Sequence, residues 1–147
     1  MKQFYKSLLS FVSSLRDLPP LINRFILCFG FYEPARNKLQ HFSDIIGWFG
    51  QLGIPAPTLN AYMAVATECS GILLLFLGLG TRVMCVPMMV VMIVAVATVH
   101  WQNGFSCSQN GFEVPFYYFC MLFGLIITGP GRFSIDHLIK QKFGDSF

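Results

Sequence analysis

The segment from Leu59 to Gly78 is apolar along almost its whole length and carries one charged side chain, Glu68. The segment is long enough to cross the hydrocarbon core of a bilayer, which takes about 20 helical residues. A carboxylate at the centre of such a helix costs about 2.5–3.5 kcal/mol on insertion scales. A charge of this cost usually faces a bundle interior and has a partner. Glu68 is therefore the first residue to consider for function.

Composition supports a membrane protein. The chain has 147 residues, of which 54% are hydrophobic and 12% charged, whereas soluble domains have about 25% charged residues. These values predict a single membrane domain over residues 1–147. The net charge of +3 is too small to indicate binding to nucleic acid, and the basic residues near the chain ends are suited to contact with anionic lipid.

Four hydrophobic segments joined by short connections predict an all-α, antiparallel four-helix bundle that crosses the membrane with each helix. Pro20 lies at the start of the first segment, where proline is tolerated in a helix. The expected spans cover about residues 21–39, 59–79, 83–100 and 114–128.

The two chain ends are expected to lie outside the bundle. Residues 1–18 place apolar side chains on one helical face and lysines elsewhere, a pattern typical of an amphipathic helix on the membrane surface. This stretch lacks the unbroken apolar core of a secretory signal peptide. In the tail over 129–147, Ser134 is expected to cap a short helix over 135–142.

The distribution of basic residues predicts the orientation. Lysine and arginine flank the first and last spans, and Arg82 lies in the second connection, whereas the loop over 101–113 contains neither residue. The positive-inside rule then predicts cytoplasmic termini. The loops over 40–58 and 101–113 are expected on the opposite side.

Under that topology, several polar residues reach the outer half of the membrane. Ala64, Gly71 and Gly78 lie on one face of the second span together with Glu68, and such small residues mark helix interfaces in lipid. This seam predicts that Glu68 points inward. The proposed outer cluster consists of Glu33, Lys38, Glu68, His100 and Glu113.

An inward carboxylate in a low dielectric must be protonated or meet a cation. The candidate partners are Arg24, Lys38 and His100, and depth favours Lys38 and His100. Our hypothesis gives Glu68 and His100 catalytic roles as a proton-accepting pair. Arg24, Lys38, Glu33 and Glu113 are then candidates for substrate binding.

His100 continues the helical stripe formed by Met89, Ile93 and Val96, which predicts that it reaches the outer boundary of the third span on that face. Trp101, which follows it, suits an interfacial aromatic belt. Trp101 and Asn103 complete the set of candidate substrate-binding residues, with Trp101 expected in the wall of the pocket.

The sequence predicts no metal site. Met84, Met88 and Met92 form a helical stripe whose thioethers suit Cu(I), but such a stripe is more typical of packing. The five cysteines form no C-x-x-C pair. Cys107 falls in a polar loop and is expected to be exposed. The cysteines expected to be buried in different helices are Cys28, Cys69, Cys85 and Cys120.

Taken together, four pieces of sequence resemble the DoxX family of small bacterial inner-membrane proteins. These are Arg24 with Lys38-Leu39, Glu68-Cys-Ser-Gly71 through Gly78-Leu-Gly-Thr81-Arg82, Ala97-Thr-Val-His100, and Gly129-Pro-Gly131-Arg-Phe-Ser134-Ile-Asp136. They fall in the family's order and span about residues 21–138. The run from His100 to Gly104 also looks like the subgroup found beside genes for metal-binding peptide biosynthesis.

The resemblance implies a four-helix protein of the bacterial inner membrane. Relatives include the small subunit of an archaeal thiosulfate:quinone oxidoreductase and members assigned to membrane redox complexes. Quinone, membrane lipid and protein partners are the ligands that this resemblance implies. A homo-oligomer is also compatible with it.

Three functions remain open from the sequence. The first is a redox subunit that handles quinone, or passes reducing equivalents between quinone and a periplasmic thiol or sulfur partner, without a covalently bound cofactor. The second is a non-enzymatic scaffold or assembly subunit, including one for metal-binding peptide biosynthesis. The third is a permease for a small molecule or metal, for which four spans are few.

Overall fold

The computed structural model of the chain describes residues 3, 5 and 13–144, and the regular structure in that part is helical throughout. The surface helix expected over residues 1–18 lies largely outside the described residues. The longer helices are α2 (Leu18–Gln40), α3 (Phe42–Gln51), α4 (Pro57–Leu77), α5 (Thr81–Ala95), α6 (Glu113–Thr128) and α7 (Ile135–Phe143).

Proline and glycine set several of these helix boundaries. Proline stands in the first turn of α2 and of α4, where its missing N–H costs no helical hydrogen bond. Gly78 and Gly80 adopt positive φ angles of 65° and 57° in the turn between α4 and α5. Ser134 Oγ accepts a hydrogen bond of 3.2 Å from His137 N, which confirms the expected cap of α7.

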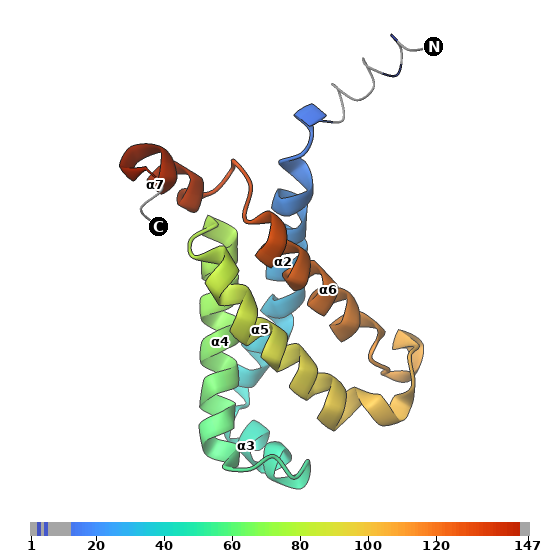
Figure 1. Ribbon diagram of the computed structural model, residues 1–147. Helices are drawn as coiled ribbons and strands as arrows, with labels where there is room; N and C mark the ends of the chain where they lie inside the picture. Colours follow the sequence, from blue (N-terminus) through green and yellow to red (C-terminus); the bar gives the residue numbers. More distant parts are fainter. Residues whose placement is uncertain (1–2, 4, 6–12, 145–147) are drawn as a thin grey trace.

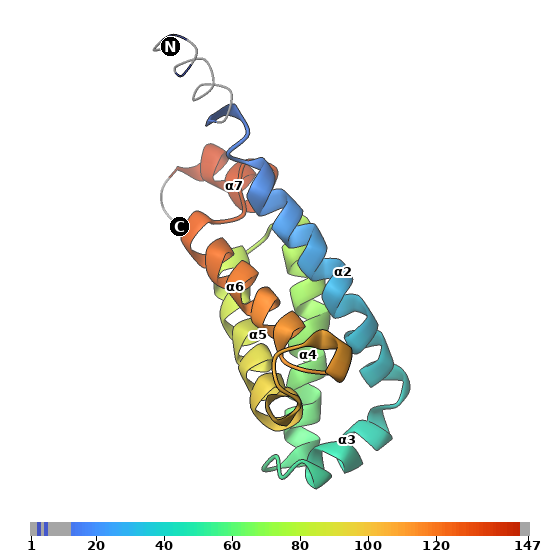
Figure 2. The same cartoon turned by 90° about the vertical axis from the view of Figure 1, so that its right-hand side faces the viewer.

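The four longest helices pack in a ring. α2 contacts α4 and α6, and α5 contacts α4 and α6. Figures 1 and 2 show that α7 and the start of α2 lie at one end of this ring, which we call the α7 end. α3 and the loop before α6 lie at the opposite end, the α3 end.

Within the described residues, two helical stretches are long and apolar enough to cross a membrane, Pro57–Leu77 and Thr81–Asn103. Helix α6 is apolar but shorter. Helix α2 carries charged residues that include Arg24, Glu33 and Lys38. The hydropathy of these helices alone therefore supports two membrane spans.

Helix α3 corrects the sequence prediction of a loop over residues 40–58. Its apolar side chains Ile45 and Phe49 are buried and pack with Ala61 of α4. The helix thus closes the α3 end by covering the first turns of α4. The spacing of Ile45 and Phe49 was a usable amphipathic signal.

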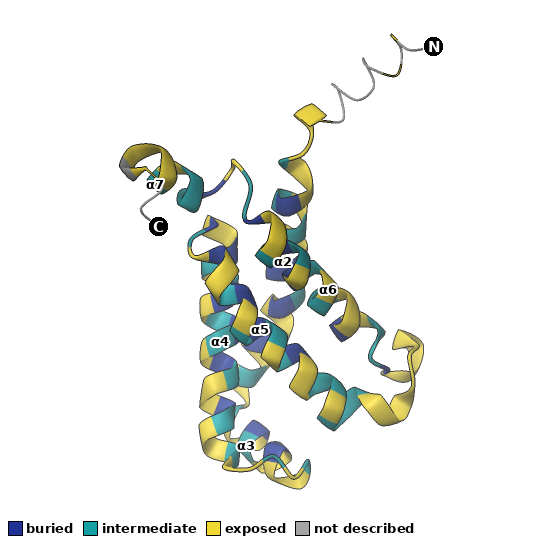
Figure 3. Cartoon of the chain, in the orientation of Figure 1, coloured by how far each residue is buried: buried dark blue, intermediate teal, exposed yellow. Residues whose placement is uncertain are grey.

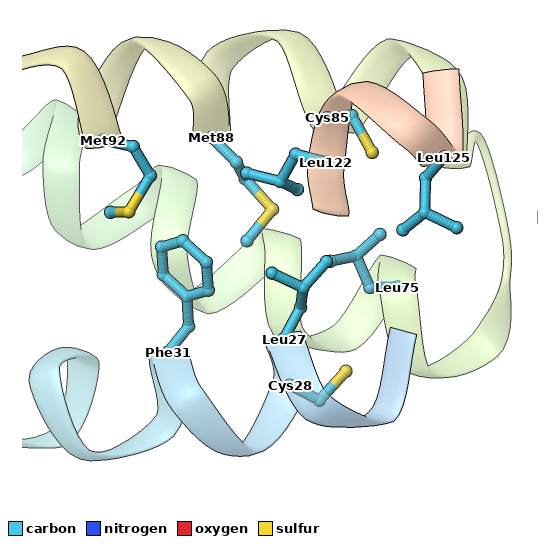
Figure 4. Close-up of a cluster of buried hydrophobic side chains, with 9 residues drawn as sticks. All are labelled: Leu27, Cys28, Phe31, Leu75, Cys85, Met88, Met92, Leu122 and Leu125. Carbon is cyan, nitrogen blue, oxygen red and sulfur yellow. The ribbon is translucent and has the colours of Figure 1, made fainter. Parts of the chain in front are cut away.

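The core fills the ring toward the α7 end. Leu27, Leu75, Leu122 and Leu125, one or two from each of three helices, are fully buried, and Figure 4 shows them meeting the sulfur-containing side chains of α5. Met88 and Met92 belong to this cluster, so the methionine stripe packs the core.

The outside of the ring is apolar and exposed. Large apolar side chains there, such as Phe29 and Val83, are nearly four-fifths exposed. Figure 3 shows the buried residues on the inner helix faces. Cys107 is exposed, as expected, and Cys28 and Cys85 are buried. The expectation of burial is wrong for Cys120, which lies on the exposed face of α6, and Cys69 is half-buried.

Candidate functional site

Glu68 forms an ion pair with Lys38 of α2. Lys38 Nζ lies 2.8 Å from Glu68 Oε1 and 2.9 Å from Oε2, so the ammonium donates to both carboxylate oxygens. The Glu68 side chain is 2% exposed and that of Lys38 is 15% exposed. Lys38 is thus the partner, one of the two residues that depth in the sequence favoured.

The small residues of α4 place Glu68 inside the ring. Gly71, one turn after Glu68, lies against Met88 of α5, and a Cβ at this position would stand 2.5 Å from the methionine sulfur. α4 therefore approaches α5 closely here, with the Glu68 face turned inward. Because α2 packs along α4, the long Lys38 side chain reaches the carboxylate from the neighbouring helix.

A cavity of about 700 Å³ borders the ion pair, and we call it the ion-pair cavity. Its walls come from α2, α3, α4, α5, α6 and the loop before α6. Most wall residues are apolar. The polar and aromatic side chains in the wall include Lys38, Glu68, His100, Cys107, Trp48 and Tyr118.

His100 reaches this cavity because α5 ends in a π-helix, Val96–His100. Ile93 and Val96 line a different hollow on the outside of the ring, so the expected stripe that joined them to His100 is broken. A π-turn holds one more residue than an α-turn, which rotates the following side chains by roughly 100°. π-turns are frequent at functional sites.

His100 and Glu68 do not form the pair that we expected. His100 Nδ1 lies 2.8 Å from the carbonyl oxygen of Asn110. The same carbonyl accepts a hydrogen bond of 3.1 Å from Asn103 Nδ2. His100 and Glu68 share the ion-pair cavity without a hydrogen bond, and Asn103 holds the loop rather than lining the cavity.

Glu113 organises the same loop. Its carboxylate accepts hydrogen bonds from Cys107 N at 2.9 Å and from Tyr117 Oη at 3.0 Å. A hydrogen bond with Glu113 and the charge of that carboxylate raise the pKa of the Cys107 thiol. At a given pH, a smaller fraction of this thiol is therefore ionised than for an ordinary cysteine, which makes it less nucleophilic.

Arg24 lies away from Glu68, toward the α7 end. Its guanidinium is 2% exposed and donates to the carbonyls of Leu75 at 2.6 Å, Phe76 at 2.7 Å, Phe133 at 2.7 Å and Pro130 at 3.1 Å. These contacts tie the end of α4 to the segment before α7. Arg24 therefore ties helix ends together and is not the partner of Glu68, and its expected role in substrate binding stays a prediction.

Trp101 and Glu33 also lie apart from the ion pair. Trp101 is 66% exposed, stacks on Phe112 with ring centroids 5.5 Å apart, and lines the outside hollow instead of the ion-pair cavity. Glu33 is exposed on α2 and makes no ion pair with any residue that the structure describes.

Trp48 and Tyr118 were missed by the sequence argument. Trp48 comes from α3, which was expected to be a loop. Tyr118 packs against Phe31 with ring centroids 5.6 Å apart, beside Gly30, where any side chain would collide with the tyrosine ring. The alignment of a glycine on one helix with an aromatic residue on another leaves no signal in one sequence.

The DoxX family model matches residues 20–101, more than half of the chain. An uncharacterised protein of Haemophilus influenzae (strain Rd) is 30% identical over 132 residues, which cover 84% of each chain. A Bacillus subtilis (strain 168) protein named "Putative oxidoreductase CatD" is 27% identical over 123 residues, which cover 84% of this chain and 88% of that protein. No solved structure matches. The chain is therefore a membrane protein of the DoxX family.

Proposed function

We propose that this protein is a four-span membrane subunit of a redox system that binds a quinone in the ion-pair cavity. The observation that carries the proposal is the Lys38–Glu68 pair, almost fully buried yet at the wall of a cavity of about 700 Å³. Apolar pockets with a few convergent polar groups are the usual sites for small amphipathic ligands. The likeness to a protein named as an oxidoreductase supports the same class.

The proposed topology has α2, α4, α5 and α6 as spans and both termini in the cytoplasm of the bacterial cell. Its support is the ring packing of these helices and the lack of lysine and arginine in the loop over 101–113. The α3 end, with the ion-pair cavity, then faces the periplasm.

The proposed chemistry needs a partner that supplies electrons. Oxidation of two thiols to a disulfide in a periplasmic partner releases two electrons and two protons, and quinone takes up both to become quinol. Within the cavity, Lys38 has the N–H groups to donate to a quinone carbonyl oxygen. Glu68 is positioned to pass protons, because its carboxylate borders the same space.

A permease role has less support. The fully buried side chains Leu27, Leu75 and Leu122 fill the ring between the ion-pair cavity and the α7 end. A polar solute would have to cross this packed apolar layer. The scaffold role is separated from the redox role by experiment, because a scaffold needs the fold of the cavity but no ligand in it.

The test uses Lys38→Met, Glu68→Gln and the double variant in purified protein. Lys38→Met leaves the buried Glu68 carboxylate without its partner and is expected to destabilise the protein by roughly 3 kcal/mol. Glu68→Gln removes the charge but keeps an amide oxygen that can accept from Lys38 Nζ, so it should destabilise the protein less. The double variant removes both charges, so it should recover most of that stability. Glu33→Gln is the matched control, because it neutralises an exposed carboxylate of α2 that forms no ion pair with the described residues.

The readout is the binding of a short-tailed benzoquinone, followed by quenching of Trp48 fluorescence, because Trp48 lines the cavity. We expect the folded double variant to lose binding and Glu33→Gln to keep it. A stable double variant that binds the quinone as the wild type does would show that the ion pair is structural, and the redox proposal would fail.

A further inference from the structure

The ion-pair cavity reaches the outside of the ring between α4 and α5. Met63 of α4 and Val90 of α5 line the cavity, and yet they are 58% and 53% exposed. Val86 and Val94 share both properties, at 54% and 41% exposure. A residue that lines a cavity and is also half exposed lies at its mouth. These four residues therefore mark an opening on the side of the ring.

The opening follows from how α4 and α5 diverge. Near their connecting turn the two helices touch, with Gly71 against Met88 and Ser70 Oγ 3.9 Å from Met84 Sδ. Figure 1 shows α4 and α5 separating from this turn toward the α3 end. Met63, Val90 and Val94 lie beyond these contacts, in the separated part, whereas Val86 lies beside them on the outer face of α5. Glu68 lies at the inner side of the opening, less than one turn of α4 from Gly71.

We propose that this opening is the route by which a lipid-soluble quinone reaches the Lys38–Glu68 pair directly from the bilayer. Its ring would lie at the ion pair and its isoprenoid tail would leave between Met63 and Val90. The inference rests on the proposed function and adds to it the class of substrate and the path.

The chemistry of the opening favours a lipid-soluble ligand over a water-soluble one. The four side chains at the opening are apolar, and with α4 and α5 as membrane spans they face hydrocarbon. A polar solute would lose its hydration on this path, whereas a hydrocarbon tail already lies in that medium. The polar ion pair on the inner side requires a ligand with a hydrogen-bonding head, so an apolar lipid chain alone would leave the Lys38 N–H groups without a new partner.

A second copy of the chain fits the opening less well. An interface helix between spans would present an apolar side chain to the buried ion pair, which offers no compensation for the polar groups. A quinone satisfies both parts of the site, because its carbonyl oxygens accept hydrogen bonds and its tail is hydrocarbon.

The experiment narrows the opening with tryptophan. Val90→Trp and Met63→Trp each place a large ring at the opening, one from each helix. Val83→Trp and Leu73→Trp are the controls, because these residues are exposed on the same two helices, at 78% and 60%, and line neither cavity. Radiolabelled quinones with one common ring and either a long isoprenoid tail or a short tail are titrated into protein in lipid nanodiscs.

We expect the tryptophan variants at the opening to affect the long-tailed quinone and not the short-tailed one. Val90→Trp and Met63→Trp should weaken binding of the long-tailed quinone by about tenfold and leave the short-tailed quinone unchanged, and both controls should bind both quinones as the wild type does. Equal loss of both quinones, or loss of neither, would overturn the side opening while leaving the proposed function in place. A wild type that binds neither quinone would overturn the proposed function itself.

Discussion

Arg24, which is buried, and Lys38, which is 15% exposed, are both cations on α2 that face α4, but they have opposite surroundings. Arg24 gives its donors to four backbone carbonyls, and packed side chains surround it at the α7 end. Lys38 has one carboxylate partner and a cavity beside it. The difference teaches that burial of a charge does not by itself indicate a reactive site. Lys38 differs from Arg24 because it has space for a ligand beside it.

The neighbours of Arg24 strengthen this contrast. Asp136 accepts hydrogen bonds from Gly80 N at 2.7 Å and Thr81 N at 3.2 Å, which places an acceptor at the start of α5. Its own N–H donates to the carbonyl of Gly78 at 3.0 Å. The segment before α7 is thus bound to the α4–α5 turn. Residues 129–136, one of the four pieces of sequence that resemble the DoxX family, therefore have a structural role at the α7 end.

The largest expected effect is on stability, and it tests the structural role of Arg24. Arg24→Met removes the donors of four carbonyls and should lower the free energy of unfolding by about 3–4 kcal/mol. Denaturation in mixed detergent micelles measures the change. Arg82→Met is the control, because Arg82 is exposed and makes a single bond of 3.3 Å to Ile127. An Arg24→Met protein as stable as the control would contradict the contrast between the two cations.

An intermediate effect tests how tightly the α7 end is packed. Gly78 and Gly80 both have positive φ, so alanine is strained at either position, by about 1 kcal/mol. A Cβ at Gly78 would also lie 2.5 Å from Ser134 Cβ and 2.7 Å from an Arg24 guanidinium nitrogen, whereas one at Gly80 meets nothing. Gly78→Ala should therefore lower the melting temperature more than Gly80→Ala. Equal decreases in melting temperature for the two variants would contradict this, because they would mean that the α7 end rearranges to accommodate the added methyl group.

The smallest effect concerns the thiol at the α3 end. Because Glu113 raises the pKa of Cys107, less thiolate exists at about pH 8 than for an ordinary cysteine, and alkylation there should be slow. Glu113→Gln lowers the pKa and should speed alkylation at that pH, while the rates converge at higher pH where both thiols are ionised. The measurement is the pH profile of Cys107 labelling by a membrane-impermeant reagent, with Glu33→Gln as the control.

The same labelling tests the proposed orientation. In intact spheroplasts the reagent should reach Cys107 from the periplasmic side. Labelling that appears only after the membranes are broken would place the α3 end, and the ion-pair cavity with it, on the cytoplasmic side.

Local signals explain which parts of the fold were predictable. The prolines and glycines at the helix ends locate α2, α4, α5 and α6 to within a few residues, because their backbone constraints act within one turn. Depth along two antiparallel helices reduced the favoured partners of Glu68 to Lys38 and His100, but it did not choose between them, and the structure pairs Glu68 with Lys38. Arg24 could not be assigned in this way, since its partners are backbone carbonyls, which every residue has.

The remainder depends on contacts that no short window of sequence contains. His100 was placed on the face of Ile93 by counting α-helical steps, and the π-helix invalidates that count. Helix α3 contains two glycines, which lower helix propensity, and its stability comes from packing of Ile45 and Phe49 on α4. The first error arose from an irregular helical turn, and the second arose where packing outweighs local preference.

The π-helix at the end of α5 has a genetic consequence. A protein that gains or loses one residue in this turn changes which side chain faces the ion-pair cavity, without any substitution. Loss of a single codon, such as that of Ala97, would turn His100 away from the cavity and bring a different part of the loop toward it. In relatives of this protein, an in-frame insertion or deletion of one codon would therefore change which side chains line the ion-pair cavity while the ion pair itself is kept.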